Sequence, residues 1–156
     1  MSDNLTIEQQ RSGEAYFMVK KVIELEHTNP EKYKSRAKNL PSMVRTNGLL
    51  QSLSFLLSKA SDDSGCELIA EHVRQWIENA IKKQWLPEPT GNHHVKTLQS
   101  TIHWLTQVDV EQYMLVTSEV LNFSPWLKRF ASGMIQKEKK EVGNADNNAA
   151  GNEQLP

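Results

Sequence analysis

The fold class is decided by Leu68-Ile69-Ala-Glu-His-Val73-Arg-Gln-Trp76-Ile77-Glu-Asn-Ala80-Ile81. The apolar residues of this stretch recur at steps of three and four, which places them along one face of an α-helix. No stretch of the chain alternates apolar and polar residues convincingly enough to require a β-strand. The sequence therefore predicts an all-α protein, and the segments on both sides of this stretch extend the prediction.

Two helices are predicted at the N-terminal end. The first runs from Thr6 to His27, and the pair Thr6 and Gln9 resembles a capping box. The second is short and basic, and it spans residues 31–39 after an asparagine cap and a proline at its first position. We expect it to end at Leu40-Pro41, because proline disfavours a helical conformation for the residue before it.

Residues 42–59 allow two interpretations. Asn47-Gly48 is a strong turn signal and favours a β-hairpin, whereas the leucines around it fit a helical stripe. We favour a continuous helix from Ser42 to Lys59. Because glycine inside a helix costs on the order of 1 kcal/mol relative to alanine, we expect Gly48 to allow the close approach of another backbone. The residues expected to serve structural packing are Tyr33, Leu40, Pro41, Asn47, Gly48 and Trp126.

The rest of the chain supplies the remaining helices and a tail. Residues 61–65 read as a loop or cap before the opening stretch, and residues 87–91 as a proline-rich connector after it. A fifth helix covers residues 95–105, and a sixth starts at the cap Asp109, with Pro125 expected to kink or restart it. The predicted architecture is a compact single-domain bundle of about six helices over residues 1–141, followed by a disordered polar tail over residues 142–156.

Composition excludes several classes of protein. The single cysteine, Cys66, cannot form an internal disulfide, and the N-terminus lacks the basic-then-apolar order of a secretory signal. No apolar run approaches the roughly 20 residues that a membrane-spanning helix needs. These features predict a cytoplasmic protein without a membrane partner.

The residues that carry enzyme chemistry form no recognisable pattern. The five histidines lack the helical spacing with glutamate that marks a zinc site, and no glycine-rich loop or nucleophile elbow is present. We therefore expect no enzyme activity, no metal and no cofactor. Trp76, Trp104 and Trp126 lie on apolar stripes and are expected in the core, while Trp85 is expected to be partly exposed.

Positive charge is concentrated in one segment of a chain whose net charge is only −1. Residues 20–45 hold seven lysines and arginines against three glutamates, a net charge of +4. Lys34 and Lys38 are four residues apart and share a helix face, with Arg36 turned away by about 200°. Such a face is suited to contacting phosphates.

Several blocks of sequence resemble one family. They are Glu8-Gln-Gln-Arg11, Lys32-Tyr33-Lys-Ser-Arg36-Ala37-Lys-Asn-Leu40-Pro41, Arg45-Thr-Asn47-Gly48-Leu49-Leu50-Gln51, Phe55-Leu56, Asp109-x-x-x-Tyr113-x-x-x-Thr117-x-Glu119-x-Leu121 and Trp126-Leu127-Lys128-Arg129-Phe130-Ala131. Together they closely resemble the small subunits of type III-B CRISPR effector complexes, the Cmr complexes. The blocks span most of residues 8–131.

The resemblance implies a noncatalytic helical protein that acts in antiviral defence. Several copies would stack into an inner filament beside the backbone subunits of the complex, with the large and capping subunits as further partners. The filament would support the duplex of guide RNA and target RNA without reading its sequence.

The resemblance also points to candidate RNA-binding residues, which are the basic residues in or beside the matching blocks: Lys20, Lys21, Lys34, Arg36, Lys38, Arg45, Lys128 and Arg129. We expect a subset of them to contact phosphates, and Arg11 to serve structure or a subunit contact. The alternative is a general helical protein–protein adaptor whose basic face is incidental.

Overall fold

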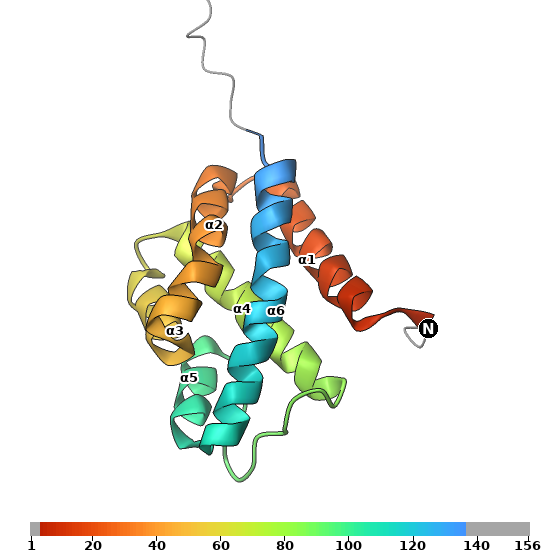
Figure 1. Cartoon of the computed structure of the whole chain (residues 1–156). Coiled ribbons are helices and arrows are strands. Elements are labelled where there is room, and N and C mark those ends of the chain that lie inside the picture. Colours follow the sequence, from red (N-terminus) through yellow and green to blue (C-terminus); the bar gives the residue numbers. More distant parts are fainter. Residues whose placement is uncertain (1–3, 137–156) are drawn as a thin grey trace, which may run out of the picture.

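The computed structural model describes residues 4–136, which form six α-helices and no strand (Figure 1). The predicted tail over residues 142–156, and residues 137–141 of the predicted domain, lie outside this range. The helices are α1 (Ile7–Glu24), α2 (Pro30–Asn47), α3 (Leu49–Lys59), α4 (Ser64–Lys82), α5 (Leu98–Gln107) and α6 (Val110–Met134). The predicted all-α bundle is confirmed within the described range.

Helix α6 organises the bundle. It lies between α1 and α2 and packs against both, with α4 behind it (Figure 1). The stripe of α4 that we identified in the sequence is buried against these helices, and Trp76 stacks on Phe123 of α6 with ring centroids 4.5 Å apart. Burial of this apolar face provides the main driving force for folding.

The predicted caps are present at the helix starts. Thr6 and Gln9 form the capping box of α1, Asn29 caps α2 with Pro30 at its first position, and Asp63 caps α4 by accepting from the backbone N–H of Cys66 at 2.9 Å. Asp109 caps α6 in the same way. Each cap satisfies an N–H group that has no partner inside its helix.

The boundary predicted at Leu40-Pro41 is wrong. Helix α2 continues through Pro41 to Asn47. A proline inside a helix removes one hydrogen bond and costs roughly 3 kcal/mol. Leu40, Pro41 and Val44 are all buried in the core, and this packing outweighs the local preference.

The continuous helix predicted over residues 42–59 is also wrong, as is the hairpin alternative. Gly48 separates α2 from α3, with φ +86° and ψ +163°. Its N–H donates to Val44 O at 2.9 Å, and its carbonyl accepts from Ser52 N at 3.1 Å, so one residue ends α2 and starts α3. A Cβ on Gly48 would lie 3.8 Å from the Tyr113 hydroxyl, an ordinary contact. Glycine is needed here for its positive φ and not for the approach of a backbone.

The close backbone approach that we expected occurs at a different glycine. A Cβ on Gly65, in the first turn of α4, would lie 2.7 Å from the carbonyl oxygen of Lys32 in α2. No real Cβ contact is that short without a shift of the backbone, so the absence of a side chain sets the distance between α2 and α4 at this point.

Candidate nucleic-acid interface

The continuity of α2 places three candidate residues on one stripe. At 100° per residue, Lys34, Lys38 and Arg45 fall within about 40° of one another around the helix axis. Lys38 and Arg45 are exposed and Lys34 is half-buried. The sequence assigned Arg45 to a separate helix, whereas the structure adds it to the stripe.

Arg36 points to another side of α2 and is engaged in an ion pair. Its guanidinium contacts the Asp63 carboxylate at 2.6 Å, at the cap of α4. The hydrogen bond from Arg36, together with the backbone N–H of Cys66, lowers the pKa of Asp63 to about 2. Arg36 therefore holds the start of α4 against α2 and is less available to a phosphate than its neighbours on the helix.

Lys34 links α2 to the end of α6. Its Nζ donates to the carbonyl oxygen of Ile135 at 2.9 Å. A positive charge at this position is also attracted by the negative, C-terminal end of the α6 dipole. Just beyond the other end of α2, the N–H of Leu50 in α3 donates to the hydroxyl of Tyr113 in α6 at 3.0 Å. These two contacts fix α2 and α6 side by side and antiparallel.

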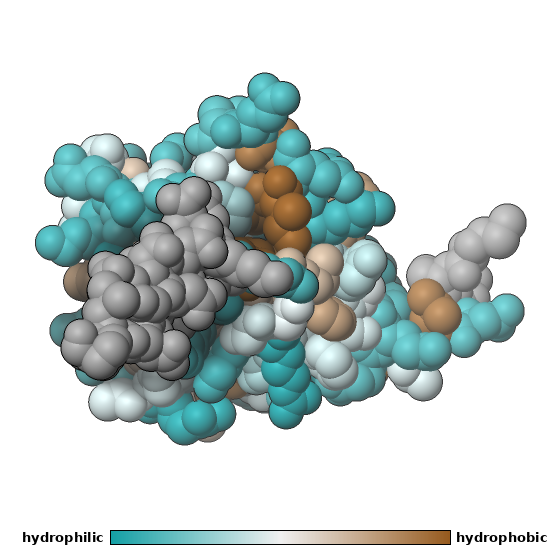
Figure 2. Space-filling view, turned by 90° about the horizontal axis from the view of Figure 1, so that it is seen from above, coloured by the Kyte–Doolittle hydropathy of each residue, from teal (hydrophilic) through white to brown (hydrophobic). Residues whose placement is uncertain are grey.

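Lys128 lies on the side of α6 that faces α2. Around the axis of α6 it lies about 160° from Trp126, whose indole contacts α1 on the opposite side of α6 from α2 (Figure 1). Lys128 is exposed. We name the set Lys34, Lys38, Arg45 and Lys128 the α2–α6 basic face. Seen from the end of the bundle where α6 stops, the surface is mainly hydrophilic around a small hydrophobic group (Figure 2).

The other three candidates lie outside this face. Lys20 is on α1, 3.8 Å from Glu24, and Lys21 lies over the Phe17 ring at 4.7 Å from its centroid. Arg129 is next to Lys128 in the sequence, but its guanidinium lies 5.7 Å from the centre of the Trp126 ring, whose indole contacts α1. Of the eight predicted residues, four therefore form the α2–α6 basic face, three lie outside it on α1 and α6, and Arg36 pairs with Asp63.

A buried ion pair joins two of the sequence blocks. Arg11 of α1 donates two hydrogen bonds to the Glu119 carboxylate of α6, at 2.9 and 2.8 Å, and the Trp76 indole N–H donates to the same carboxylate at 3.0 Å. Its hydrogen bonds to the Glu119 carboxylate raise the pKa of Arg11. We name this contact the Arg11–Glu119 seam. The sequence did not identify it, although both charged residues fall at fixed positions of the resembling blocks.

The residues expected to pack differ in their surroundings. Leu40 and Pro41 are buried, and buried Tyr33 has its hydroxyl 2.7 Å from His72 Nδ1. Burial lowers the pKa of His72 to about 4, so its ring is neutral at pH 7. Asn47 is exposed as the last residue of α2, so it does not pack in the core.

Trp126 is half-buried rather than part of the core, because it lies along the line where α6 meets α1. Its indole N–H donates to Glu8 of α1 at 2.6 Å. The other tryptophans lie as expected: Trp76 and Trp104 are buried, and Trp85 is half-buried.

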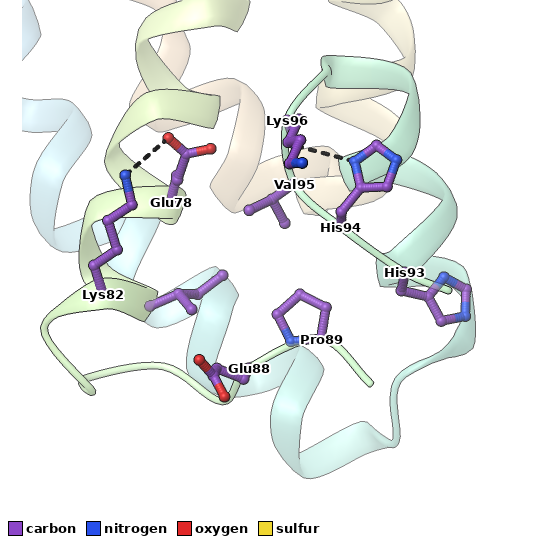
Figure 3. Close-up of a pocket in the computed structure, with 9 residues that line it drawn as sticks. Glu78, Lys82, Glu88, Pro89, His93, His94, Val95 and Lys96 are labelled. Atoms are coloured by element: carbon purple, nitrogen blue, oxygen red, sulfur yellow. Dashed lines mark hydrogen bonds and ion pairs between the residues drawn. The ribbon is translucent and has the colours of Figure 1, made fainter. Parts of the chain in front are cut away.

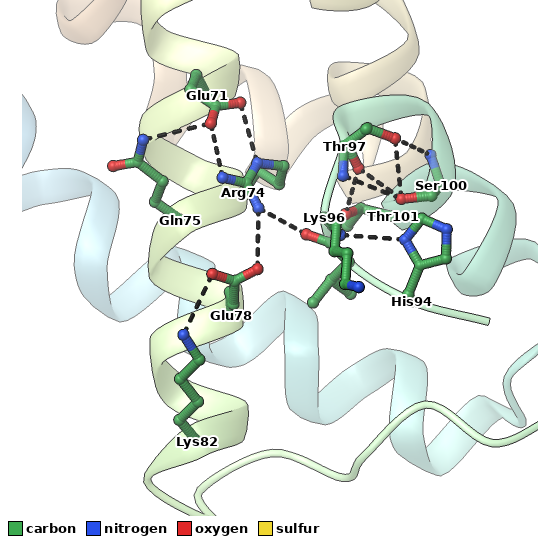
Figure 4. A network of polar contacts seen from close by, with 11 residues as sticks. Glu71, Arg74, Gln75, Glu78, Lys82, His94, Lys96, Thr97, Ser100 and Thr101 are labelled. Carbon is green, nitrogen blue, oxygen red and sulfur yellow. Dashed lines mark hydrogen bonds and ion pairs between the residues drawn. The ribbon is translucent and has the colours of Figure 1, made fainter.

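A pocket lies away from the basic face, between α4 and residues 88–96 (Figure 3). It is an open depression of about 600 Å³, and its lining combines charged side chains of both signs and two histidines with the apolar side chains of Ile81, Pro89 and Val95. Behind it, the buried guanidinium of Arg74 contacts Glu71 at 2.6 Å and Glu78 at 3.2 Å and donates to Val95 O at 2.6 Å (Figure 4). This network fastens the connector to α4, which is a structural role.

Residues 4–136 contain no group of three or more histidine, cysteine, aspartate or glutamate side chains placed to hold a metal ion. In the same range, no helix is long and apolar enough to cross a membrane.

Comparisons with known proteins agree with the resemblance. Residues 7–134 match a family model described as CRISPR-associated protein (Cas_Cmr5). The fold is similar to the crystal structure of a CRISPR-associated Cmr5 family protein from Thermus thermophilus, with a TM-score of 0.65 and 24% sequence identity. The similarity covers 85% of this chain and 100% of that one.

Proposed function

The chain belongs to the Cmr5 family, the small subunits of type III-B CRISPR effector complexes, and on that premise we propose that it supports an RNA duplex inside such a complex through its α2–α6 basic face. The duplex is formed by guide RNA and target RNA. Contacts to phosphates position a nucleic acid without reading its bases, so this support is independent of sequence. The protein is a noncatalytic, cytoplasmic component of antiviral defence.

The proposal rests on a contrast between positively charged residues that are paired with carboxylates and those that are exposed on the surface. Arg11, Arg36 and Arg74 form close ion pairs with carboxylates. Lys38, Arg45 and Lys128 are exposed and lie on adjoining surfaces of two antiparallel helices. Exposed cations on one surface attract a polyanion at low cost, because they remain hydrated and need not leave a carboxylate to contact a phosphate.

Exposed apolar side chains support the further proposal that several copies stack beside the backbone subunits of the complex. At the start of α6, Val110, Met114 and Leu115 are 75%, 64% and 48% exposed. Large apolar groups that gather on a surface are typical of protein contacts. They lie on the first two turns of α6, away from Lys128, so protein and RNA would use different parts of the same helix.

Reconstitution of the complex with and without this subunit tests the proposal. We expect that omission shortens the inner filament and weakens the binding of target RNA. Unchanged filament length and unchanged RNA binding would contradict it. If the subunit were required for assembly but charge reversal at Lys38, Arg45 and Lys128 left RNA binding intact, the adaptor alternative would be correct instead.

A further inference from the structure

A second surface carries aromatic side chains next to positive charges, along the line where α1 meets α6. The Trp126 and Phe130 rings are stacked with centroids 5.7 Å apart, and Tyr16 of α1 packs edge-on against Phe130, also at 5.7 Å. The Arg129 guanidinium lies over Trp126. We name these four residues, Tyr16, Trp126, Arg129 and Phe130, the aromatic ledge.

The ledge is accessible and held in position. Tyr16 is 48% exposed, although it is a large aromatic residue that packing could have covered. The Tyr16 and Phe130 rings meet at an interplanar angle of 87°, so they do not stack face to face. The hydrogen bond to Glu8 fixes the Trp126 indole, so this part of the surface is preorganised.

The positive charges beside the ledge favour an anionic ligand. Arg129 is exposed and follows Lys128 of the α2–α6 basic face directly. Lys20 lies one turn after Tyr16 on α1, and its ion pair with Glu24 is long, at 3.8 Å, and exposed. The Glu8 carboxylate, which accepts from the Trp126 indole, is an acidic group in contact with the ledge. Aromatic rings and a planar guanidinium beside lysines form the kind of surface on which unpaired bases stack.

We propose that the aromatic ledge stacks on unpaired bases of a single-stranded segment of RNA that adjoins the duplex held by the α2–α6 basic face. This rests on the proposed function and deepens it, since it adds contacts to bases that the phosphate contacts lack. Every base has a flat aromatic face, so stacking on the ledge is also independent of sequence. The ledge thereby favours a strand with accessible bases over one whose bases are hidden in a duplex.

The test compares two RNA strands of equal length and charge. One is an ordinary single strand, and the other lacks the bases at its central positions but keeps every phosphate. Binding of each strand to the full chain is measured by fluorescence anisotropy at low salt. We expect the abasic strand to bind at least about fivefold more weakly, which is the lower end of the range for one base stacked on an aromatic ring.

Two variants assign that difference to the ledge. The double variant Tyr16→Ala, Arg129→Lys keeps the net charge and is expected to bring the ratio of the two affinities to about one. Phe55 of α3 is 41% exposed, so Phe55→Ala removes an exposed aromatic ring elsewhere and is expected to preserve the ratio. Circular dichroism of all variants verifies that they are folded.

The possible failures are distinguishable. Equal affinity of the wild-type chain for the two strands, with binding still weakened by salt, would overturn the ledge proposal and leave the proposed function intact. Absence of binding to either strand, with a duplex of the same length still bound, would overturn the ledge proposal alone, whereas absence of binding to all three RNAs would contradict the proposed function itself. If the double variant kept the affinity ratio but no longer joined the reconstituted complex, the ledge would be a protein contact.

Discussion

The Arg11–Glu119 seam and the α2–α6 basic face use positive charge in opposite ways. In the seam, the Arg11 guanidinium makes two hydrogen bonds to a carboxylate that also accepts from Trp76, and both charged side chains are mostly covered. On the basic face, Lys38 and Arg45 extend into solvent. One region keeps α1 on α6, and the other leaves its charge for a partner.

The difference shows that the role of a charged residue depends on its burial and on its partners. A buried charge that loses its partner is costly because it stays desolvated, whereas an exposed charge can be removed at little cost. We therefore expect substitutions in the seam to change stability and substitutions on the face to change binding. The predictions below test this division, from the largest expected effect to the smallest.

The largest loss of stability is expected for Glu119→Ala. It leaves the Arg11 guanidinium and the Trp76 N–H without their acceptor, and breaking a buried pair in this way costs about 3–5 kcal/mol. Chemical denaturation of the variant measures the free energy of unfolding. Glu111→Ala removes an exposed carboxylate from the same helix and serves as the control. Equal stability of the two variants would show that the seam does not hold α1 to α6.

His72→Gln is expected to change how stability depends on pH. Burial lowers the pKa of His72 from 6.5 to about 4 in the folded protein. Between these values the unfolded chain binds a proton that the folded chain does not, so stability is full above pH 6.5 and falls as the pH falls toward 4. The expected loss is about 3 kcal/mol. Glutamine does not titrate, so the variant should lack this component, which denaturation curves at several pH values would detect. Parallel pH profiles for wild type and variant would contradict the prediction.

Two glycine substitutions test the packing between α2 and α4. Gly65→Ala places a methyl group 2.7 Å from the Lys32 carbonyl oxygen and is expected to destabilise the protein by about 1–3 kcal/mol. Gly13→Ala is the matched control, because its added methyl group meets no atom within 4 Å, and it is expected to stabilise α1 by about 0.5–1 kcal/mol. Thermal denaturation measures both. A Gly65→Ala protein as stable as wild type would show that the helices can move apart freely.

Lys34 belongs to the basic face but also contacts the end of α6, so we expect its substitution to affect stability as well as binding. Lys34→Gln is expected to cost about 1 kcal/mol, since the Ile135 carbonyl loses a charged donor. Lys38→Gln on the same stripe should change stability by less than about 0.5 kcal/mol. Urea denaturation of the two variants distinguishes them, and a larger loss for Lys38→Gln would reverse the roles assigned to the two lysines.

The sequence predicted the elements that depend on local patterns and failed where distant packing decides. The stripe of α4 and the caps at Thr6 and Asp63 follow from residues a few positions apart, and the structure contains them. Helix α2 continues through Pro41 because residues around it are buried against other helices, and a local sequence pattern does not predict such burial. Gly48 was recognised as unusual, but its role depends on a backbone angle.

The candidate site shows the same division. The spacing of Lys34 and Lys38 was enough to place them on one face, whereas the addition of Arg45 required the continuity of α2. Lys128 joins them only because α6 packs antiparallel to α2. The pairing of Arg36 with Asp63 links residues 27 positions apart, and the local sequence around either residue does not predict it.

The role of the α2–α6 basic face is tested most directly by the salt dependence of RNA binding. Two triple variants remove equal charge: Lys38→Gln, Arg45→Gln, Lys128→Gln on the face, and Lys59→Gln, Lys82→Gln, Lys96→Gln at exposed lysines elsewhere. Each phosphate contact contributes about 0.7 to the slope of log affinity against log salt for a single strand. We predict that the first variant loses about two units of slope and the second keeps the wild-type value. Equal slopes for the two variants would contradict the assignment of RNA contacts to this face.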